Sequence, residues 1–388
     1  MEKPFLIAGG GIGGLACALA LARKGFAVRL FEQQGEFREA GAGIQLGPNM
    51  FKALERLDLK DAVLADAWQP GAQEMRCALS GKLVARIPLE EEFRAKFKEP
   101  YGVTHRHDLL AAYLKACKAQ KLISLETSRR VESFRDEGAR VVVTLSNGDE
   151  VEGEALIGSD GVWSRVREQI VGDGAPIVSG HIAYRAVLKK SEVPEDLWQP
   201  DVVLWAGPRT HLVHYPLRRG ELYNLVAVFH SKQYVEGWDA AGDTALLWRH
   251  FKGQRPEVLR MLERIETWRM WVLCDREPVK NWSKGRVTLL GDAAHPMLQY
   301  LAQGANMATE DAVVLAEKLS EAKGDVAAAC TAYQEARYKR TAWVQIMARI
   351  YGELYHAEGV KAELRNESLG ARTPQDAYKG VEWLYAGI

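Results

Sequence analysis

The sequence predicts an α/β fold in which a parallel-sheet domain is interleaved with an antiparallel β-sheet domain and followed by C-terminal helices. Three observations carry this prediction. An apolar strand, a glycine cluster and an alanine-leucine helix follow one another near the N-terminus. Strand-like runs such as 201–205 and 222–229 dominate the stretch from about 176 to 276. Residues from 326 to about 363 are rich in alanine and arginine with helical patterning.

The composition is that of an ordinary globular protein with more than one domain. The chain has 388 residues, and at about 150 residues per domain this length gives a prior of two or three domains. Its 51 Lys and Arg residues balance 51 Asp and Glu residues, so the net positive field that attracts nucleic acid is missing. The five cysteines include no C-x-x-C pair to bind zinc. We therefore expect a cytoplasmic protein with no nucleic-acid partner and no bound metal.

The N-terminal segment has the pattern of a nucleotide-binding unit. It runs through a strand, a turn, a helix and a second strand: residues 4–8, Gly9-x-Gly11-x-x-Gly14, 15–23 and 27–32. Glycines at this spacing let the backbone approach a pyrophosphate, whose charge is met by N–H groups at the helix N-terminus. Glu32 ends the second strand, where a carboxylate accepts both hydroxyls of an adenosine ribose and repels a 2′-phosphate. The sequence predicts a Rossmann-like domain for FAD or NAD, not NADP.

The same segment also has the length of a membrane span or a leader, because residues 5–22 carry no charge. Five of these residues are glycines at the turn positions. We therefore expect a strand-turn-helix here and no transmembrane segment in the chain.

Later elements alternate in a way that indicates two interleaved domains. Expected helices and strands are 108–120, 141–145, 155–158, 287–292 and 310–322, with a hairpin turn at Asn147-Gly148. The predicted nucleotide-binding domain takes residues 1–75, 101–175 and 277–325. The predicted substrate domain takes 76–100 and 176–276, and 326–388 form the C-terminal helical region.

Two further motifs each follow a buried strand. They are Gly158-Ser159-Asp160-Gly161, continuing to Arg167, and Gly291-Asp292-Ala293-Ala294-His295-Pro296, continuing through Gly304-Ala305-Asn306. With the N-terminal glycines, and in this order, they resemble the single-component FAD-dependent aromatic hydroxylases, the class that includes p-hydroxybenzoate, salicylate and 3-hydroxybenzoate hydroxylases. The resemblance covers nearly the whole chain.

The resemblance implies a p-hydroxybenzoate hydroxylase-like fold with FAD as cofactor and NADH or NADPH as a visiting co-substrate, since the chain has one G-x-G-x-x-G. It implies that reduced flavin meets O2, forms a C4a-hydroperoxide and passes oxygen to a phenolic ring. The implied FAD-binding residues are Gly9, Gly11, Gly14, Glu32, Gly43, Arg106, Val131, Asp160, Asp292, Gly304, Ala305 and Asn306. Among them, Asp292 is expected at the ribityl chain, and Gly304 opens a helix whose N-terminus stabilises negative charge at the flavin pyrimidine edge. Without the resemblance, a surface ion pair of Arg106 with Asp160 is an alternative.

Two histidines of the predicted substrate domain are candidates for the base that deprotonates a phenol, because the imidazole pKa of about 6.5 lies near the working pH. His211 and His214 are three apart on a strand and point to opposite faces, so only one can face the flavin. Tyr215 shares the face of His211. Resemblance to the 3-hydroxybenzoate 6-hydroxylases favours His211 as catalytic base and Tyr215 in the substrate pocket, and a histidine that merely fills a strand is the alternative.

Gln299 marks a departure from most of the class, which has proline at this position, while the 3-hydroxybenzoate 6-hydroxylases by resemblance have glutamine. Its amide can donate to and accept from a substrate hydroxyl or carboxylate. Tyr101 is either a substrate-binding residue or a plain core aromatic, and His295 is expected to hold its loop.

The sequence thus predicts that 3-hydroxybenzoate, NADH and O2 give 2,5-dihydroxybenzoate (gentisate). Alternatives are a salicylate 1-hydroxylase, a hydroxypyridine-carboxylate monooxygenase, and a flavin-binding sensor or carrier without oxygenase activity. The apolar C-terminal helices leave a homodimer open.

Overall fold

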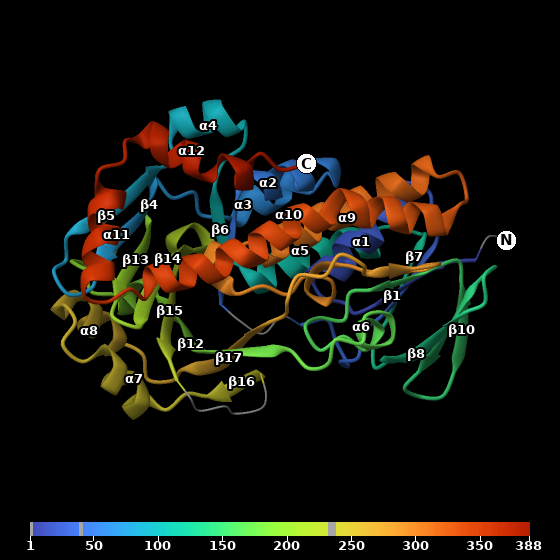
Figure 1. Cartoon of the computed structure of the whole chain (residues 1–388), viewed down its shortest axis with the longest axis horizontal. Helices are drawn as coiled ribbons and strands as arrows, with labels where there is room; N and C mark the ends of the chain where they lie inside the picture. Colours follow the sequence, from blue (N-terminus) through green and yellow to red (C-terminus); the bar gives the residue numbers. More distant parts are fainter. Residues whose placement is uncertain (1–2, 39–41, 232–237) are drawn as a thin grey trace.

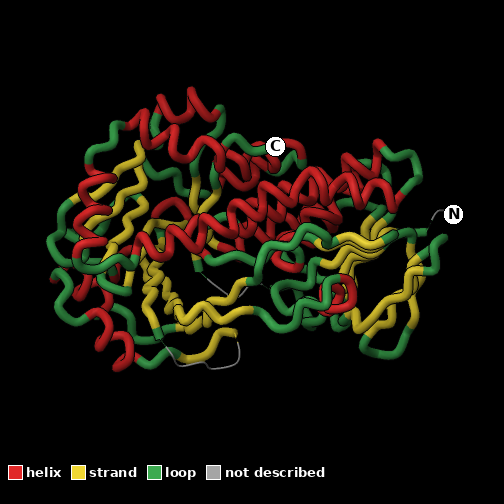
Figure 2. The backbone as a smooth tube through the Cα atoms, viewed as in Figure 1, coloured by secondary structure: helices red, strands yellow, loops and turns green. Residues whose placement is uncertain are grey.

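Two sheets lie at opposite ends of the elongated molecule, and one long helix runs from one to the other (Figure 1). The computed structural model describes residues 3–38, 42–231 and 238–388. In the tube view the strands form separate groups, with most of the helices above and between them (Figure 2).

The sheet near the N-terminus is six-stranded and mostly parallel. Its strands, in spatial order, are β18 (Ser283–Lys284), β19 (Val287–Leu289), β11 (Leu156–Gly158), β1 (Phe5–Ala8), β2 (Val28–Phe31) and β7 (Ile123–Glu126). Only the β18–β19 pair is antiparallel among its described pairs. The helices α1 (Ile12–Arg23), α5 (Arg106–Lys118) and α9 (Gly304–Glu321) share a core with these strands. Three segments far apart in the chain therefore build one Rossmann-like unit.

The second sheet is eight-stranded. Its spatial order is β16 (Trp238–Ala241), β17 (Arg269–Asp275), β12 (Ile177–Lys189), β15 (Leu222–His230), β14 (Thr210–Leu217), β13 (Val202–Gly207), β4 (Ala72–Cys77) and β5 (Leu83–Pro88). All of its described pairs are antiparallel except β13–β4. β4 joins this sheet from an earlier part of the chain than the other strands apart from β5. β4 begins at Ala72. The predicted boundaries of the two domains remain a prediction.

The two faces of the eight-stranded sheet have different covers. One face packs on α7 (Thr244–Phe251) and α8 (Pro256–Leu262), two short helices that the strand-rich texture of 176–276 did not reveal. The other face turns toward the C-terminal helices and the short helix η4 (Gln299–Leu301). The candidate site lies on this second face.

The C-terminal region is helical, as expected, but it is broken into three pieces: α10 (Val326–Tyr355), α11 (Val360–Gly370) and α12 (Pro374–Tyr385). The predicted helix to about 363 ends early because His356 caps α10 and Gly359 takes a positive φ of 56°. Trp343, Ile346 and Ile350 are exposed on α10. A homodimer through this helix remains a prediction. Within the described residues, no helix combines the length and the apolar character needed to cross a bilayer.

Smaller elements connect these parts. A three-stranded sheet contains β8 (Val131–Asp136), β9 (Val141–Leu145) and β10 (Glu150–Gly153), with the expected hairpin at Gly148, whose φ is +87°. A two-stranded sheet pairs β3 (Gly43–Leu46) with β6 (Gly102–His105). The other helices are α2 (Pro48–Arg56), α3 (Lys60–Asp66), α4 (Glu91–Phe97), α6 (Arg165–Ile170), η1 (Lys190–Glu192), η2 (Arg218–Gly220) and η3 (Gly291–Ala293).

Candidate active site

The turn between β1 and α1 consists of glycines, so no side chains cover the backbone at the N-terminus of α1. Gly9 has φ +101°, and a Cβ there would lie 2.3 Å from the Ser159 carbonyl oxygen. A Cβ at Gly14 would lie 2.0 Å from the Gly9 carbonyl oxygen. Helix α1 has Gly11 as its N-cap, a residue that has no side chain to accept from the first N–H groups of the helix. Such a helix start suits a phosphate group.

Glu32 lies beside this turn at the end of β2. Its two carboxylate oxygens accept from the backbone N–H groups of Gly10 and Gln34, each at 2.8 Å. The backbone N–H of Arg129 donates to the Glu32 carbonyl at 2.8 Å, which brings the start of β8 and the buried Val131 close to Glu32. A carboxylate next to a phosphate-binding turn fits the ribose of a dinucleotide, with Val131 nearby for the adenine.

Asp160, in the second motif, is bound by its own loop. Its carboxylate accepts from the Ser164 hydroxyl and from the backbone N–H of Arg165 at 2.9 Å. Burial raises the pKa of Asp160 above its ordinary value, although these bonds oppose the shift. The loop is also tied to the third motif. The buried Arg167 donates to the carbonyls of Ala293 (2.9 Å) and Ala294 (2.7 Å). Arg167 was not among the predicted site residues, although its place at the end of the motif was a usable signal.

The third motif brings an accessible carboxylate to a second helix N-terminus. Asp292 is exposed, and one of its carboxylate oxygens lies 3.7 Å from where a Cβ of Gly304 would be. Helix α9 begins at Gly304, and the side chain of its N-cap residue, Gln303, makes no capping hydrogen bond. Asn306 is fully buried and holds the neighbouring loop, because its amide accepts from the Gly47 N–H at 3.2 Å and donates to the Ala302 carbonyl at 2.7 Å. Asp292 and the first N–H groups of α9, next to the half-buried Ala305, are the parts that suit a polar ligand.

A buried ion-pair network supports this helix. His295 and Asp311 are 2.5 Å apart, and Arg337 of α10 donates to Asp311 (2.7 Å) and Glu310 (2.6 Å). Burial raises the pKa of Asp311, but the neighbouring charges of His295 and Arg337 outweigh burial and lower it below its usual range. His295 has the loop-holding position that the sequence analysis expected.

Tyr215 and Gly43 meet where the large sheet approaches the β3–β6 pair. A Cβ at Gly43 would lie 2.7 Å from the Tyr215 hydroxyl, so only glycine permits this approach. The Gly43 N–H donates to the Asn224 side-chain oxygen at 2.8 Å. The Asn224 amide nitrogen is buried and has no hydrogen-bond partner among the described residues. A buried donor in this position fits a ligand with acceptor atoms, and Asn224 was visible in the sequence as a lone amide in an apolar strand.

Tyr101 belongs to the buried aromatic cluster that also contains Tyr215. Its hydroxyl donates to Gln45 at 2.5 Å, and its ring lies 6.0 Å from that of Tyr385. Gln45 also lies close enough to Tyr215 to oppose the rise that burial causes in the Tyr215 pKa. Gln45 therefore links the two tyrosines, a link that no sequence pattern indicated. Arg106, the first residue of α5, donates its backbone N–H to the Ala42 carbonyl at 2.9 Å, and its charge also opposes that rise.

Gln299 contacts Arg185, a cationic side chain of the eight-stranded sheet. The Arg185 guanidinium donates to the Gln299 side-chain oxygen at 2.7 Å and lies 4.9 Å from the centre of the Trp271 ring. In the sheet register Arg185 is opposite Val226, which is opposite Val213. Arg185 therefore lies in the row between those of His211 and Tyr215. Gln299 was among the residues predicted from the sequence, whereas Arg185 was not.

His211 and His214 lie on opposite faces of β14, as their spacing predicted. His211 contacts His356 at the end of α10, with 2.7 Å between Nδ1 and Nε2. His214 accepts from the Trp205 indole N–H at 2.9 Å and lies 2.8 Å from the Tyr223 hydroxyl. Burial lowers the pKa of each histidine to about 3. This value lies well below the pKa of about 6.5 that the choice of histidine as base assumed, because burial disfavours the charged ring. Both rings are therefore neutral at pH 7, and only His211 faces the candidate site.

Comparison with known proteins decides the family. Residues 2–348 match the family model described as FAD binding domain. The chain belongs to this family. It is 45% identical over 384 residues to a 3-hydroxybenzoate 6-hydroxylase of Polaromonas naphthalenivorans, covering 99% of this chain and 96% of that protein. It is 43% identical over 380 residues to a 3-hydroxybenzoate 6-hydroxylase of Klebsiella oxytoca, covering 98% and 96%.

A solved structure, Klebsiella pneumoniae HpxO complexed with FAD and uric acid, superposes with a TM-score of 0.88 at 24% identity and covers 99% of this chain and 97% of that one. This likeness confirms the predicted fold class. The protein is an FAD-dependent aromatic hydroxylase, with FAD as cofactor and NAD(P)H as the co-substrate typical of the family.

The chain's own geometry fits FAD. The glycine-lined start of α1 suits the pyrophosphate, and Glu32 suits the adenosine ribose. Asp292 and the uncapped start of α9 suit the ribityl hydroxyls and the anionic edge of the flavin. The unpartnered Asn224 amide lies on the neighbouring sheet face. The role of each individual residue at FAD remains a prediction.

Proposed function

We propose that this hydroxylase converts 3-hydroxybenzoate to 2,5-dihydroxybenzoate with NADH, O2 and one proton, releasing NAD⁺ and water. The observation that carries the proposal is one sheet face that combines a cation for the carboxylate, Arg185 with Gln299, and a neutral base for the phenol, His211. The 45% identity to a protein named 3-hydroxybenzoate 6-hydroxylase supports the same substrate. FAD, when bound, accepts hydride from NADH, reacts with O2 and supplies the oxygen atom.

Arg185 is the proposed anchor of the substrate carboxylate. Charge-assisted hydrogen bonds from a guanidinium are stronger than neutral ones, and they orient a planar carboxylate. Gln299 holds the guanidinium from the η4 side, and the Trp271 ring lies beside it. A proline at position 299 has no amide for this contact. Gln299 therefore acts on the substrate by positioning Arg185.

His211 is the proposed base for the phenolic proton. An electron-rich phenolate ring reacts more readily with an electrophilic oxygen than the neutral phenol does. The hydrogen bond of His211 to His356 uses Nδ1, so Nε2 is the nitrogen that would accept the substrate proton. The ring is 3% exposed, so bulk water does not compete at this atom.

Tyr215, Tyr101 and Asn224 are the proposed pocket residues. Tyr215 and Asn224 both contact Gly43, and Gln45 connects Tyr215 with Tyr101. Their hydroxyl and amide groups are buried among aromatic side chains. Such a setting fits one flat ring with a few polar substituents.

A substrate panel tests the proposal. Purified holoenzyme is mixed with NADH and 3-hydroxybenzoate, salicylate or a hydroxypyridine carboxylate, and NADH consumption, O2 uptake and product identity are measured. We expect 3-hydroxybenzoate to raise NADH oxidation at least about tenfold, which corresponds to about 1.4 kcal/mol of barrier, with 2,5-dihydroxybenzoate as product.

Catechol and CO2 from salicylate, without turnover of 3-hydroxybenzoate, would show that the proposed substrate is wrong. Turnover of the hydroxypyridine carboxylate alone would do the same. A yellow protein whose NADH oxidation no aromatic compound stimulates would instead be a flavin carrier or sensor.

A further inference from the structure

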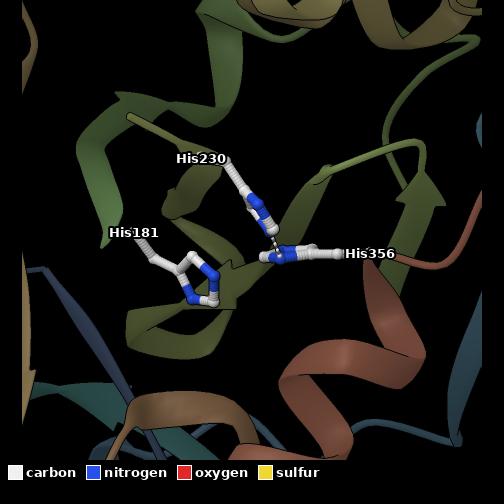
Figure 3. Close-up of side chains that lie close together, drawn as sticks. All are labelled: His181, His230 and His356. Carbon is white, nitrogen blue, oxygen red and sulfur yellow. Dashed lines mark hydrogen bonds between the residues drawn. The ribbon is translucent and has the colours of Figure 1, made fainter. Parts of the chain in front are cut away.

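A row of histidines extends from the candidate site to the surface of the molecule. On the large sheet, His181 of β12 and His230 of β15 are paired directly opposite each other. The ring of His356, at the end of α10, lies next to both of them (Figure 3). These three residues have ligand-capable nitrogens within 4.8 Å of one another. His211, one row along the sheet, contacts the same His356.

Hydrogen bonds join three of these rings into a chain. His211 Nδ1 lies 2.7 Å from His356 Nε2, and His356 Nδ1 lies 2.8 Å from His230 Nε2, the pair joined by the dashed line in Figure 3. A neutral imidazole has one N–H donor and one acceptor nitrogen. With the proton of each ring on Nδ1, every ring donates to the next one. Both hydrogen bonds therefore run in the same donor-to-acceptor direction, from His211 toward His230.

The end of this hydrogen-bonded row of histidines that is farthest from His211 reaches a surface cavity. This cavity has a volume of about 440 Å³, and His230, His181, Arg209 and His250 are among the residues that line it. His230 is half-buried, whereas His211 is 3% exposed and His356 is 4% exposed. Two imidazole–imidazole contacts thus connect the buried face that carries His211 with a site that water can enter.

The distances favour a hydrogen-bonded chain over a metal site. Two nitrogens bound to one tetrahedral Zn²⁺ at about 2.0–2.1 Å lie roughly 3.3 Å apart, farther than His356 Nδ1 and His230 Nε2. Both nitrogens of His356 already have imidazole partners at 2.7 and 2.8 Å. His181 also uses its Nδ1, which lies 2.6 Å from the Tyr300 hydroxyl.

The charges around the chain keep its rings neutral. Burial is the largest influence and lowers the pKa of His211, His356 and His230. Protonation of one ring of the group also disfavours protonation of the next, which lowers the pKa of His211 and His356 further. At His230, Arg209 and His250 of α7 act in the same direction as burial, whereas Glu353 and Glu358 oppose it. The carbonyl end of α10 at His356 favours positive charge there during passage of a proton.

We propose that His211, His356 and His230 form a proton wire that carries the phenolic proton of the substrate to the surface cavity. The inference rests on the proposed function. The phenol O–H breaks and its proton binds Nε2 of His211, while the Nδ1 proton of His211 passes to Nε2 of His356. The Nδ1 proton of His356 passes to Nε2 of His230, which releases its own Nδ1 proton to water. The reverse passage returns a proton to the product phenolate and resets the three rings.

Rapid mixing tests the wire. Holoenzyme without NADH is mixed with 3-hydroxybenzoate in weak buffer containing a pH-indicator dye, and the rate of proton release is recorded. For His356→Phe, which keeps a ring but removes both nitrogens, we expect proton release and kcat to fall about tenfold or more. The dissociation constants of FAD and of 3-hydroxybenzoate should change less than about threefold, since neither ligand contacts His356 in this proposal.

Chemical rescue separates a relay from a packing role. His356→Ala leaves space for free imidazole, whereas His356→Phe fills it. Imidazole should therefore restore the proton-release rate of the alanine variant and not that of the phenylalanine variant. His230→Gln should slow release as well and provides the test if the His356 variants fail to fold. His250→Ala, which changes the same cavity outside the chain, should release protons at the wild-type rate.

Three results would reject the wire. The first is proton release at the wild-type rate in both His356→Phe and His230→Gln, in a protein whose wild-type form turns over 3-hydroxybenzoate. This result would reject the wire and leave the proposed function intact. Another is stoichiometric Zn²⁺ in the wild-type enzyme that His356→Ala loses, because the histidines would then be a metal site. A wild-type enzyme that neither binds nor oxidises 3-hydroxybenzoate rejects the substrate and this use of the histidines together.

Discussion

The two faces of the eight-stranded sheet place two histidines, His211 and His214, in different surroundings. His214 is enclosed on the face covered by α7 and α8, where Trp205 and Tyr223 occupy both of its ring nitrogens. His211, three residues away, faces the other side and bonds through Nδ1 to His356. Both histidines are buried and neutral, with their pKa lowered to about 3.

Burial and a lowered pKa therefore do not identify a catalytic histidine in this protein. The connections of the side chain do. A histidine such as His214, whose two nitrogens bond to a tryptophan and a tyrosine, stabilises the fold, because no nitrogen is left for a substrate and neither partner is an imidazole that could pass a proton on. A histidine that uses one nitrogen for a relay partner can offer the other to a substrate proton.

The largest expected effect separates the two faces directly. His211→Ala should lower the rate of hydroxylation by roughly 10²–10⁴, the usual contribution of a general base, with little change in FAD affinity. Single-turnover oxidation of 3-hydroxybenzoate and flavin titration measure the two quantities. An unchanged hydroxylation rate would remove His211 from the mechanism.

His214→Ala is the matched variant on the other face. It leaves the Trp205 N–H and the Tyr223 hydroxyl without this partner, which should lower the free energy of unfolding by about 1–3 kcal/mol. The folded, flavin-bound fraction should still hydroxylate at close to the wild-type rate. Urea titration and turnover per bound flavin check this expectation, and a loss of turnover as large as that of His211→Ala would contradict the division between the faces.

Arg185→Gln removes the cation of the site face. We expect KM for 3-hydroxybenzoate to rise roughly tenfold to a hundredfold, since a hydrogen bond to a charged group contributes about 1.5–3 kcal/mol. The neutral analogue 3-hydroxybenzamide is the control ligand, and its affinity should change much less. Equal losses for the acid and the amide would show that Arg185 does not bind the carboxylate.

Acid should destabilise both faces, because His211 and His214 are neutral in the folded protein and protonate near pH 6.5 when unfolded. Below pH 6.5 the unfolded state binds more protons, so stability falls as pH falls, until the folded-state pKa of about 3 is reached. Each histidine should contribute up to about 1.4 kcal/mol per pH unit. Unfolding curves from pH 7 to 4 test this, and both single alanine variants should show a shallower dependence.

Gln299→Pro should have the smallest effect on rate and the clearest effect on specificity. Arg185 loses its 2.7 Å partner, so the carboxylate anchor becomes less ordered. We expect a several-fold shift in preference among hydroxybenzoates, or more NADH consumed without hydroxylation, by analogy with other losses of positioning contacts. An unaltered substrate profile and coupling ratio would mean that Gln299 does not set specificity.

Local patterns made much of the fold predictable. The G-x-G-x-x-G spacing and Glu32 identified the first βαβ unit, because such a turn involves neighbouring residues only. Period-two geometry placed His211 and His214 on opposite faces. Helices α7 and α8 escaped prediction, since with eight and seven residues they are too short to show a clear period.

By itself, the sequence determined the family, the cofactor and which strand carries the candidate base, since these depend on short motifs and on alternation along one strand. The partners of the site residues depend on the packing of distant segments. His356 lies 145 residues from His211, and Arg185 lies 114 residues from Gln299. Contacts at such separations depend on how sheets and helices pack, and neither composition nor local spacing encodes that packing in a readable form. The proposed proton wire therefore became visible only when the end of α10 was seen on the large sheet.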